Sequence, residues 1–95
     1  MFIIFTNSNE YGDHLTVVDL TNHQMAVEYA DSLSEAVQNF RTSTFDYGNS
    51  KDPMDCQYTI TDTEVFDDEG ELYGTITYRF DSIESLIDQY PEEFI

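Results

Sequence analysis

The feature that most constrains the fold is a run of alternating residues between Cys56 and Phe80. Odd positions are mostly polar, whereas most even positions carry apolar or aromatic side chains, with Asp62 and Glu64 as interruptions. Successive side chains of a strand point to opposite faces of a sheet, so this pattern predicts a half-buried antiparallel pair. We expect a β-hairpin with strands at 56–66 and 72–80. The even apolar set is Tyr58, Ile60, Phe66, Leu72, Ile76, Tyr78 and Phe80.

The turn of this hairpin reads Asp-Glu-Gly and ends at Gly70. In a three-residue hairpin loop the last residue adopts the left-handed conformation, which glycine reaches without strain. Such a loop keeps even residues opposite even residues. The expected register therefore pairs residue 66 with 72 and residue 60 with 78.

Three more strands are predicted before the hairpin. The first, at 2–6, is a compact run of β-branched and aromatic residues, which is typical of a strand buried on both faces. Weaker alternation predicts strands at 14–21 and 25–30, separated by polar residues that favour turns. These runs and the hairpin together predict an antiparallel sheet of four to five strands.

Two short helices are predicted near 31–41 and 82–90. Ser32 and Ser82 can cap them, and in each helix the apolar residues recur at i, i+3, i+4 and i+7, which is one helical face. Pro91 ends the second helix. Both apolar stripes need a common surface, and the even face of the hairpin can supply it. The predicted fold class is therefore α+β, with two short helices on one face of the sheet.

The 95 residues make a single domain. Ten residues starting at Asp31 align with ten starting at Asp81, which favours a ββα pseudo-repeat with halves 1–42 and 56–95. Residues 43–55 lack periodicity and are expected to form the loop that joins them. The alternative is that a strand followed by a capped helix is a common local solution, so that the alignment is a coincidence.

The charge is far from that of an ordinary small domain. The chain has 20 acidic and 3 basic residues, a net charge of −17, whereas solubility is served by about 2–8 charges. This excess disfavours nucleic acid and anionic membranes as direct partners and favours a basic protein surface. One cysteine, Cys56, excludes an internal disulfide, and no apolar run resembles a signal or a membrane span. We therefore expect a cytoplasmic protein.

Catalytic and metal-binding patterns are not organised in this sequence. Asp62 and Glu64 are the best pair for acid–base chemistry, but a general acid needs an apolar pocket that raises its pKa. His14, His23 and Cys56 lack the spacing of zinc ligands. The acidic turn lacks the spacing of an EF-hand calcium loop. We expect no enzymatic activity, no metal site and no cofactor.

The acidic surplus is concentrated in the second half of the chain. Residues 1–50 have seven acids and one base, net −6, whereas residues 51–95 have thirteen acids and two bases, net −11. The second hairpin and the second helix space carboxylates at about 5–7 Å, which a surface that reads DNA phosphates would accept. Tyr73 is expected on the exposed odd face as an aromatic anchor. The predicted partner-binding residues are Asp62, Glu64, Asp67, Asp68, Glu69, Glu71, Tyr73, Asp81, Glu84 and Asp88.

In size, charge and acidic-aromatic character the whole chain resembles the small acidic DNA-mimic inhibitors, often phage-encoded, that occupy DNA-binding surfaces of restriction or CRISPR enzymes. This resemblance implies a non-enzymatic inhibitor of the anti-CRISPR or anti-restriction type, acting in the host cytoplasm. The chain is equally similar to small acidic immunity proteins and antitoxins that neutralise basic nuclease toxins. A charged face that only maintains solubility is a further alternative. The oligomeric state is left open, a homodimer included.

Overall fold

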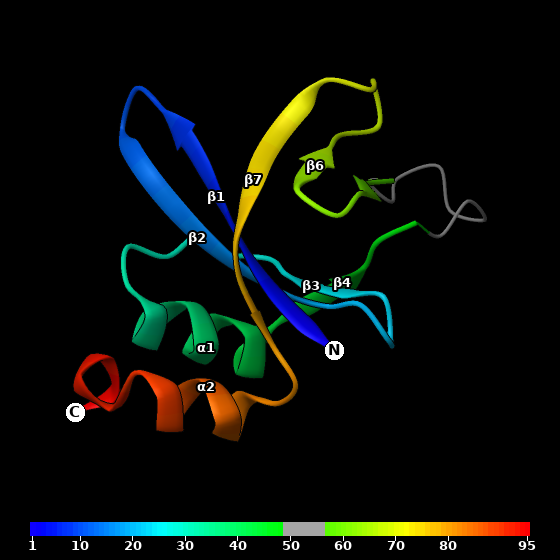
Figure 1. Cartoon of the computed structure of the whole chain (residues 1–95). Coiled ribbons are helices and arrows are strands. Elements are labelled where there is room, and N and C mark those ends of the chain that lie inside the picture. The colour runs from blue at the N-terminus through cyan, green and yellow to red at the C-terminus, as the bar shows by residue number, and fades with distance from the viewer. Residues whose placement is uncertain (49–56) are drawn as a thin grey trace.

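A computed structural model describes residues 1–48 and 57–95 (Figure 1). Within these residues the strands form one antiparallel sheet of seven, in the order β4-β3-β2-β1-β7-β6-β5. Two α-helices and a short 3-10 helix complete the fold, which is α+β as predicted. The elements are β1 (Phe2–Asn9), β2 (Gly12–Asp19), β3 (Gln24–Ala26), α1 (Leu33–Thr42), β4 (Thr44–Asp46), β5 (Thr59–Ile60), β6 (Glu64–Phe66), β7 (Leu72–Phe80), α2 (Ile83–Gln89) and η1 (Pro91–Phe94).

Strand β1 is the centre of the sheet, between β2 and β7. Its residues Ile3, Ile4 and Phe5 are completely buried. Ile4 packs in the core under the helices, whereas Ile3 and Phe5 pack in a second core on the opposite face. The prediction of a first strand buried on both faces is confirmed.

Both helices cover one face of the sheet (Figure 1). The Ser32 hydroxyl accepts a hydrogen bond from the Glu35 amide at the start of α1. In α2 the capping is reciprocal, because Ser82 and Ser85 each accept a bond from the other's amide. The two predicted helices are confirmed. Whether the two halves of the chain are true repeats stays a prediction.

The other face of the sheet encloses the second core. The ring of Phe45 in β4 lies 6.0 Å from the ring of Tyr58, which comes just before β5. Because β4 and β5 are the two outermost strands, this contact shows that the sheet curls until its two edges approach each other. Ile3, Phe5, Val18, Met25, Tyr47 and Val65 fill the interior.

The predicted sheet of four to five strands is wrong for two reasons. First, β4 lies within the predicted loop 43–55, where it pairs with β3. Second, the predicted strand 56–66 is interrupted, because the Thr61 hydroxyl accepts bonds from the amides of Thr63 and Glu64 and turns the chain between β5 and β6. Most of that loop and the predicted start at Cys56 lie outside the described residues.

The hairpin register is correct at its tip and wrong beyond it. Phe66 pairs with Leu72 as predicted, and Gly70 has the expected positive φ of 80°. Ile60, however, pairs with Val65 across the new turn and not with residue 78. The predicted strand 72–80 is confirmed as β7.

Two irregularities in β7 explain why its even residues do not share one face. Residues 72 and 74 face consecutive residues of β6, and residues 76 and 78 face consecutive residues of β1, so Tyr73 and Thr77 are extra residues of β-bulges. An extra residue shifts the alternation that follows it. Ile76 therefore packs in the second core, whereas Tyr78 and Phe80 pack under the helices. The predicted common even face is wrong.

Candidate partner-binding surface

The carboxylates of this protein are mostly exposed and unpaired. Of the 18 acidic residues at 1–48 and 57–95, 15 are exposed, Glu64 and Asp67 are partly buried, and Asp19 is buried. The same ranges contain two arginines and one ion pair, between His14 Nδ1 and Asp31 Oδ1 at 3.3 Å. The negative charge seen in the sequence is therefore presented to solvent and is not neutralised within the described structure.

The buried carboxylate of Asp19 serves the fold. It accepts hydrogen bonds from the Thr21 amide (3.0 Å) and from the Asn22 amide and side chain (3.2 and 2.9 Å). These bonds hold the turn between β2 and β3, in which His23 adopts a φ of 55°. Burial, together with the charges of Asp19 and Asp46, raises the pKa of Tyr47. We exclude Asp19 from the candidate surface.

The turn between β6 and β7 is built by Asp67. Its carboxylate accepts bonds from the amides of Glu69 and Glu71, both at 2.9 Å. This network leaves Asp68, Glu69 and Glu71 exposed around the turn, next to Leu72, which is 58% exposed. Asp67 thus positions the other carboxylates, while its own carboxylate is engaged by backbone amides.

Asp62 and Glu64 lie at the β5–β6 turn and the start of β6. Asp62 is exposed, and its carbonyl accepts a hydrogen bond from the Arg79 guanidinium. Glu64 is partly buried and pairs with Thr75 of β7. Together with the exposed acids of the β6–β7 turn they form the hairpin group, defined as Asp62, Glu64, Asp68, Glu69 and Glu71.

Tyr73 does not stand on an exposed face, and this prediction is wrong. Its ring lies 5.0 Å from Tyr58 and 5.7 Å from Phe5, and its hydroxyl contacts the Tyr29 hydroxyl. Its carbonyl accepts a bond of 2.7 Å from the Asn7 side chain. Burial and the bond to Tyr29 raise the pKa of Tyr73 well above its ordinary value. The bulge places this side chain against the second core.

A second acidic group lies on α2 and η1. The predicted residues Asp81, Glu84 and Asp88 are exposed, and neither helix has a basic residue in its last turn. Sequence reasoning missed the equally exposed Glu92 and Glu93 of η1, although both follow directly after Pro91. We call these five residues the helix group.

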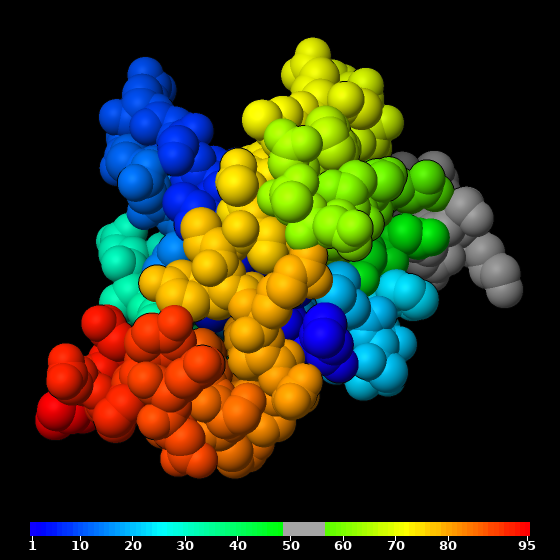
Figure 2. All heavy atoms as spheres, viewed as in Figure 1, coloured from blue at the N-terminus to red at the C-terminus, as the bar shows by residue number. Residues whose placement is uncertain are grey.

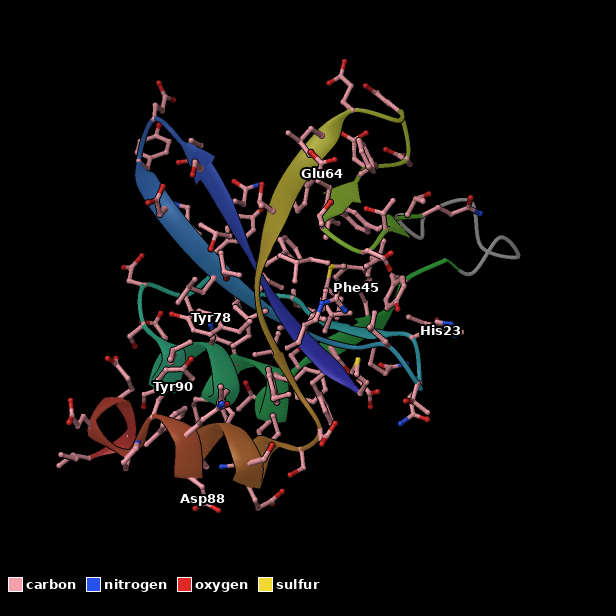
Figure 3. All side chains as sticks on the ribbon, viewed as in Figure 1. His23, Phe45, Glu64, Tyr78, Asp88 and Tyr90 are labelled. Carbon is pink, nitrogen blue, oxygen red and sulfur yellow. The ribbon has the colours of Figure 1, made fainter. Side chains whose placement is uncertain are left out.

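The structure does not bring the two predicted groups together. Asp88 points away from α2 at the lower end of the molecule, whereas Glu64 lies at the upper end near the β6–β7 hairpin (Figure 3). One flat partner surface cannot cover both groups without extending along the length of the protein.

A third exposed feature was not anticipated from the sequence. The turn between β1 and β2 contains Glu10, which is exposed, and Tyr11, which is 82% exposed, and the exposed Asp13 follows at the start of β2. This turn lies at the same end of the molecule as the β6–β7 turn, and the two project as separate lobes (Figure 2). The signal in the sequence was an aromatic residue between two acids inside a glycine-containing turn.

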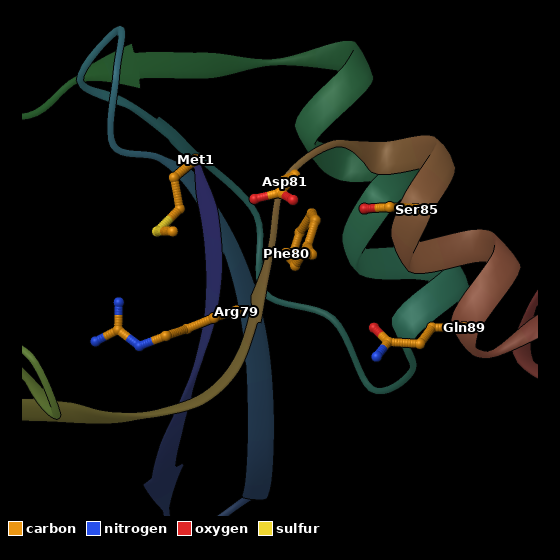
Figure 4. A pocket seen from close by; sticks show the side chains of 6 residues that line it. All are labelled: Met1, Arg79, Phe80, Asp81, Ser85 and Gln89. Carbon is orange, nitrogen blue, oxygen red and sulfur yellow. The ribbon is translucent and has the colours of Figure 1, made fainter.

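A pocket of about 300 Å³ lies between the start of β1, the end of β7 and α2 (Figure 4). The Arg79 side chain extends away from Asp81, the acidic residue of this pocket, so the lining offers no organised acid–base pair. Within the described ranges no three His, Cys, Asp or Glu side chains gather to hold a metal ion. The pocket is lined by Met1, Arg79, Phe80, Asp81, Ser85 and Gln89.

No helix in the described parts of the chain is long and apolar enough to cross a membrane. Comparison with known proteins found no matching family model, no matching curated protein and no matching solved structure.

Proposed function

We propose that this protein is a non-enzymatic inhibitor that binds a basic nucleic-acid-binding protein and mimics the charge of DNA, as anti-CRISPR and anti-restriction proteins do. One observation carries this proposal: 15 exposed carboxylates stand against two arginines in the described residues. A surface of this kind attracts cationic protein surfaces over long distances and accelerates encounter with them.

The cost of this charge to the fold supports a functional reason for it. Asp88 lies in the last turn of α2, where the helix dipole disfavours a negative charge. Glu84 stands four residues before it, and like charges at this spacing are destabilising. Residues that destabilise the helix on which they stand are expected where they contribute to binding.

The spacing within the helix group suits a phosphate-binding partner. Residues 84 and 88 are one helical turn apart, about 5–6 Å between Cβ atoms. Successive phosphates of one DNA strand rise ~3.4 Å along the axis and also turn around it, so neighbouring phosphates lie farther apart than this rise and at a separation comparable to that of the two carboxylates. The helix group and the hairpin group are separate, and each can be tested on its own.

The test uses purified restriction endonucleases, CRISPR effector nucleases and basic nuclease toxins. DNA cleavage and the binding of a labelled duplex are measured at several concentrations of the protein. We expect at least one enzyme to be inhibited, with the apparent Kd for DNA rising in proportion to the protein and the effect weakening with salt. A panel without inhibition would contradict the proposal.

Matched triple variants locate the surface. Asp68→Asn/Glu69→Gln/Glu71→Gln removes three charges from the hairpin group, and Glu84→Gln/Asp88→Asn/Glu92→Gln removes three from the helix group. Glu28→Gln/Glu35→Gln/Asp46→Asn removes three exposed charges elsewhere and is the control. We expect one of the first two variants to lose at least about tenfold in affinity, since charge-assisted contacts contribute about 1.5–3 kcal/mol each, while the control loses much less.

Two results would replace mimicry by another mode. Equal losses in all three variants would show that only net charge matters. A stable ternary complex of target, DNA and this protein would show that it binds away from the nucleic-acid site, as an immunity protein or antitoxin can. The exposed apolar side chain of Leu72 favours this second candidate, because pure charge mimicry does not need it.

A further inference from the structure

The end of the β1–β2 hairpin carries an exposed aromatic ring on a turn whose backbone is fixed by hydrogen bonds. The Tyr11 amide donates a 2.7 Å hydrogen bond to the Asn9 side chain, and the Ser8 hydroxyl donates a 2.6 Å bond to one carboxylate oxygen of Asp13. Gly12 completes the turn with a φ of 113°. The backbone of this turn is therefore fixed by its own side chains.

The Tyr11 side chain takes no part in these hydrogen bonds. Its bond to Asn9 uses the main-chain amide, and its ring contacts no other aromatic ring in the described structure. At 82% exposure it is the most exposed aromatic residue at positions 1–48 and 57–95. The backbone that carries this ring is held in place, so a partner that binds the ring orders less of the chain than it would on a mobile loop.

The base of this hairpin is joined to the neighbouring arm. Beyond the pairing of Thr6 with Thr75, β1 and β7 separate, and the Asn7 side chain bonds to the Tyr73 carbonyl across the gap. The two hairpins are therefore joined at their bases, and their ends project from the same end of the molecule (Figure 1).

We propose that the β1–β2 turn is an arginine-binding tip, in which a guanidinium group of the partner stacks on the Tyr11 ring and pairs with the carboxylates of Glu10 and Asp13. Arginine stacks on aromatic faces and pairs with carboxylates through its planar donors, whereas lysine is a compact and strongly hydrated charge. Surfaces that hold nucleic acid are rich in this group. The inference rests on the proposed function for the identity of the partner, but the chemistry of the tip can be tested without it.

The probes are a short peptide of alternating arginine and glycine and its lysine counterpart, titrated into the full-length ¹⁵N-labelled protein. We expect the arginine peptide to shift the amides of residues 8–13 and to bind about two- to five-fold more tightly than the lysine peptide, as an exposed cation–π contact predicts. Tyr11→Ala should reduce this ratio to about one without changing the net charge. Tyr11→Phe should retain it, and Leu72→Ala, which removes an exposed apolar side chain without a ring, should leave it unchanged.

Three outcomes would overturn the inference: no binding of either peptide, an arginine preference that survives in Tyr11→Ala, or amide shifts confined to the hairpin or helix group. Backbone chemical shifts of Tyr11→Ala confirm that the turn is intact. The nuclease panel reports separately on the proposed function. An arginine-selective tip in a protein that inhibits no nuclease would refute the proposed function alone, and inhibition with an unselective tip would refute this inference alone.

Discussion

Replacing Gly74 with alanine tests how tightly the second core is packed. Gly74 lies in β7 opposite Val65, and a Cβ atom there would stand 2.5 Å from Phe5 Cδ2, 2.9 Å from the Thr6 carbonyl oxygen and 3.1 Å from Phe5 Cε2. Phe5 is completely buried, so its ring has no open space to enter. The carbonyl belongs to the central strand and cannot rotate away.

The expected cost follows from two opposing effects. Overpacking of a core costs about 1–3 kcal/mol. Alanine is better than glycine in a strand by about 0.5–1 kcal/mol, since it restricts the unfolded chain. We therefore expect Gly74→Ala to lower the free energy of unfolding by about 1–2 kcal/mol, or Tm by about 4–16 °C in a domain of this size.

Thermal and urea denaturation, followed by circular dichroism, provide the measurement. Phe5→Leu supplies the partner variant, because it removes much of the ring that the new methyl group meets. The cost of Gly74→Ala should fall by at least about 0.5 kcal/mol in this background, which a double-mutant cycle can resolve. A stabilising Gly74→Ala, or the same cost in both backgrounds, would refute the packing argument.

Three further predictions concern charge and ionisation. Asp88→Asn should stabilise the protein by about 0.3–1 kcal/mol, because Asp88 is disfavoured both by the α2 dipole and by Glu84, whereas Glu84→Gln should change stability less, because the lost dipole interaction offsets the relieved repulsion; thermal melts at low salt in which Glu84→Gln stabilises as much as Asp88→Asn would contradict this. Tm should rise between low and moderate salt, since screening relieves self-repulsion, and a steady fall would show that ion pairs dominate. Because partial burial and the bond to Tyr29 raise the folded pKa of Tyr73 above the ordinary 10.0, its protonated hydroxyl contributes fully to the free energy of unfolding below about pH 10, and this contribution is lost as the pH rises through the folded pKa. Tyr73→Phe should flatten this alkaline loss in denaturation series, and an unchanged pH profile would count against a stabilising role of the Tyr73 hydroxyl.

Features whose causes lie within a few residues were predictable from the sequence. The helices begin where Ser32 and Ser82 cap them, and the β6–β7 turn follows from Gly70 at a position that needs positive φ. Strand β1 was predictable because its residues are apolar on both faces. The net charge also required no structure, and it alone disfavoured direct binding to nucleic acid.

Features that depend on strands distant in the chain were decided only by tertiary structure. The bulges at Tyr73 and Thr77 arise where β7 adjusts to β6 on one side and to β1 on the other. No local pattern records such a mismatch, so the packing of Tyr73 against the second core was missed. The curl of the sheet and its second core have the same origin, because they depend on contacts between β4 and the segment before β5.

The candidate surface shows the same division. The sequence by itself determined how many carboxylates the protein carries and that two arginines and one lysine could not neutralise them. Only the folded chain decided that the hairpin group and the helix group lie at opposite ends and that Tyr11 is far more exposed than Tyr73. Charge is a property of composition, whereas its arrangement depends on which distant strands pair, and the pairing of β1 with β7 sets the positions of both hairpin ends.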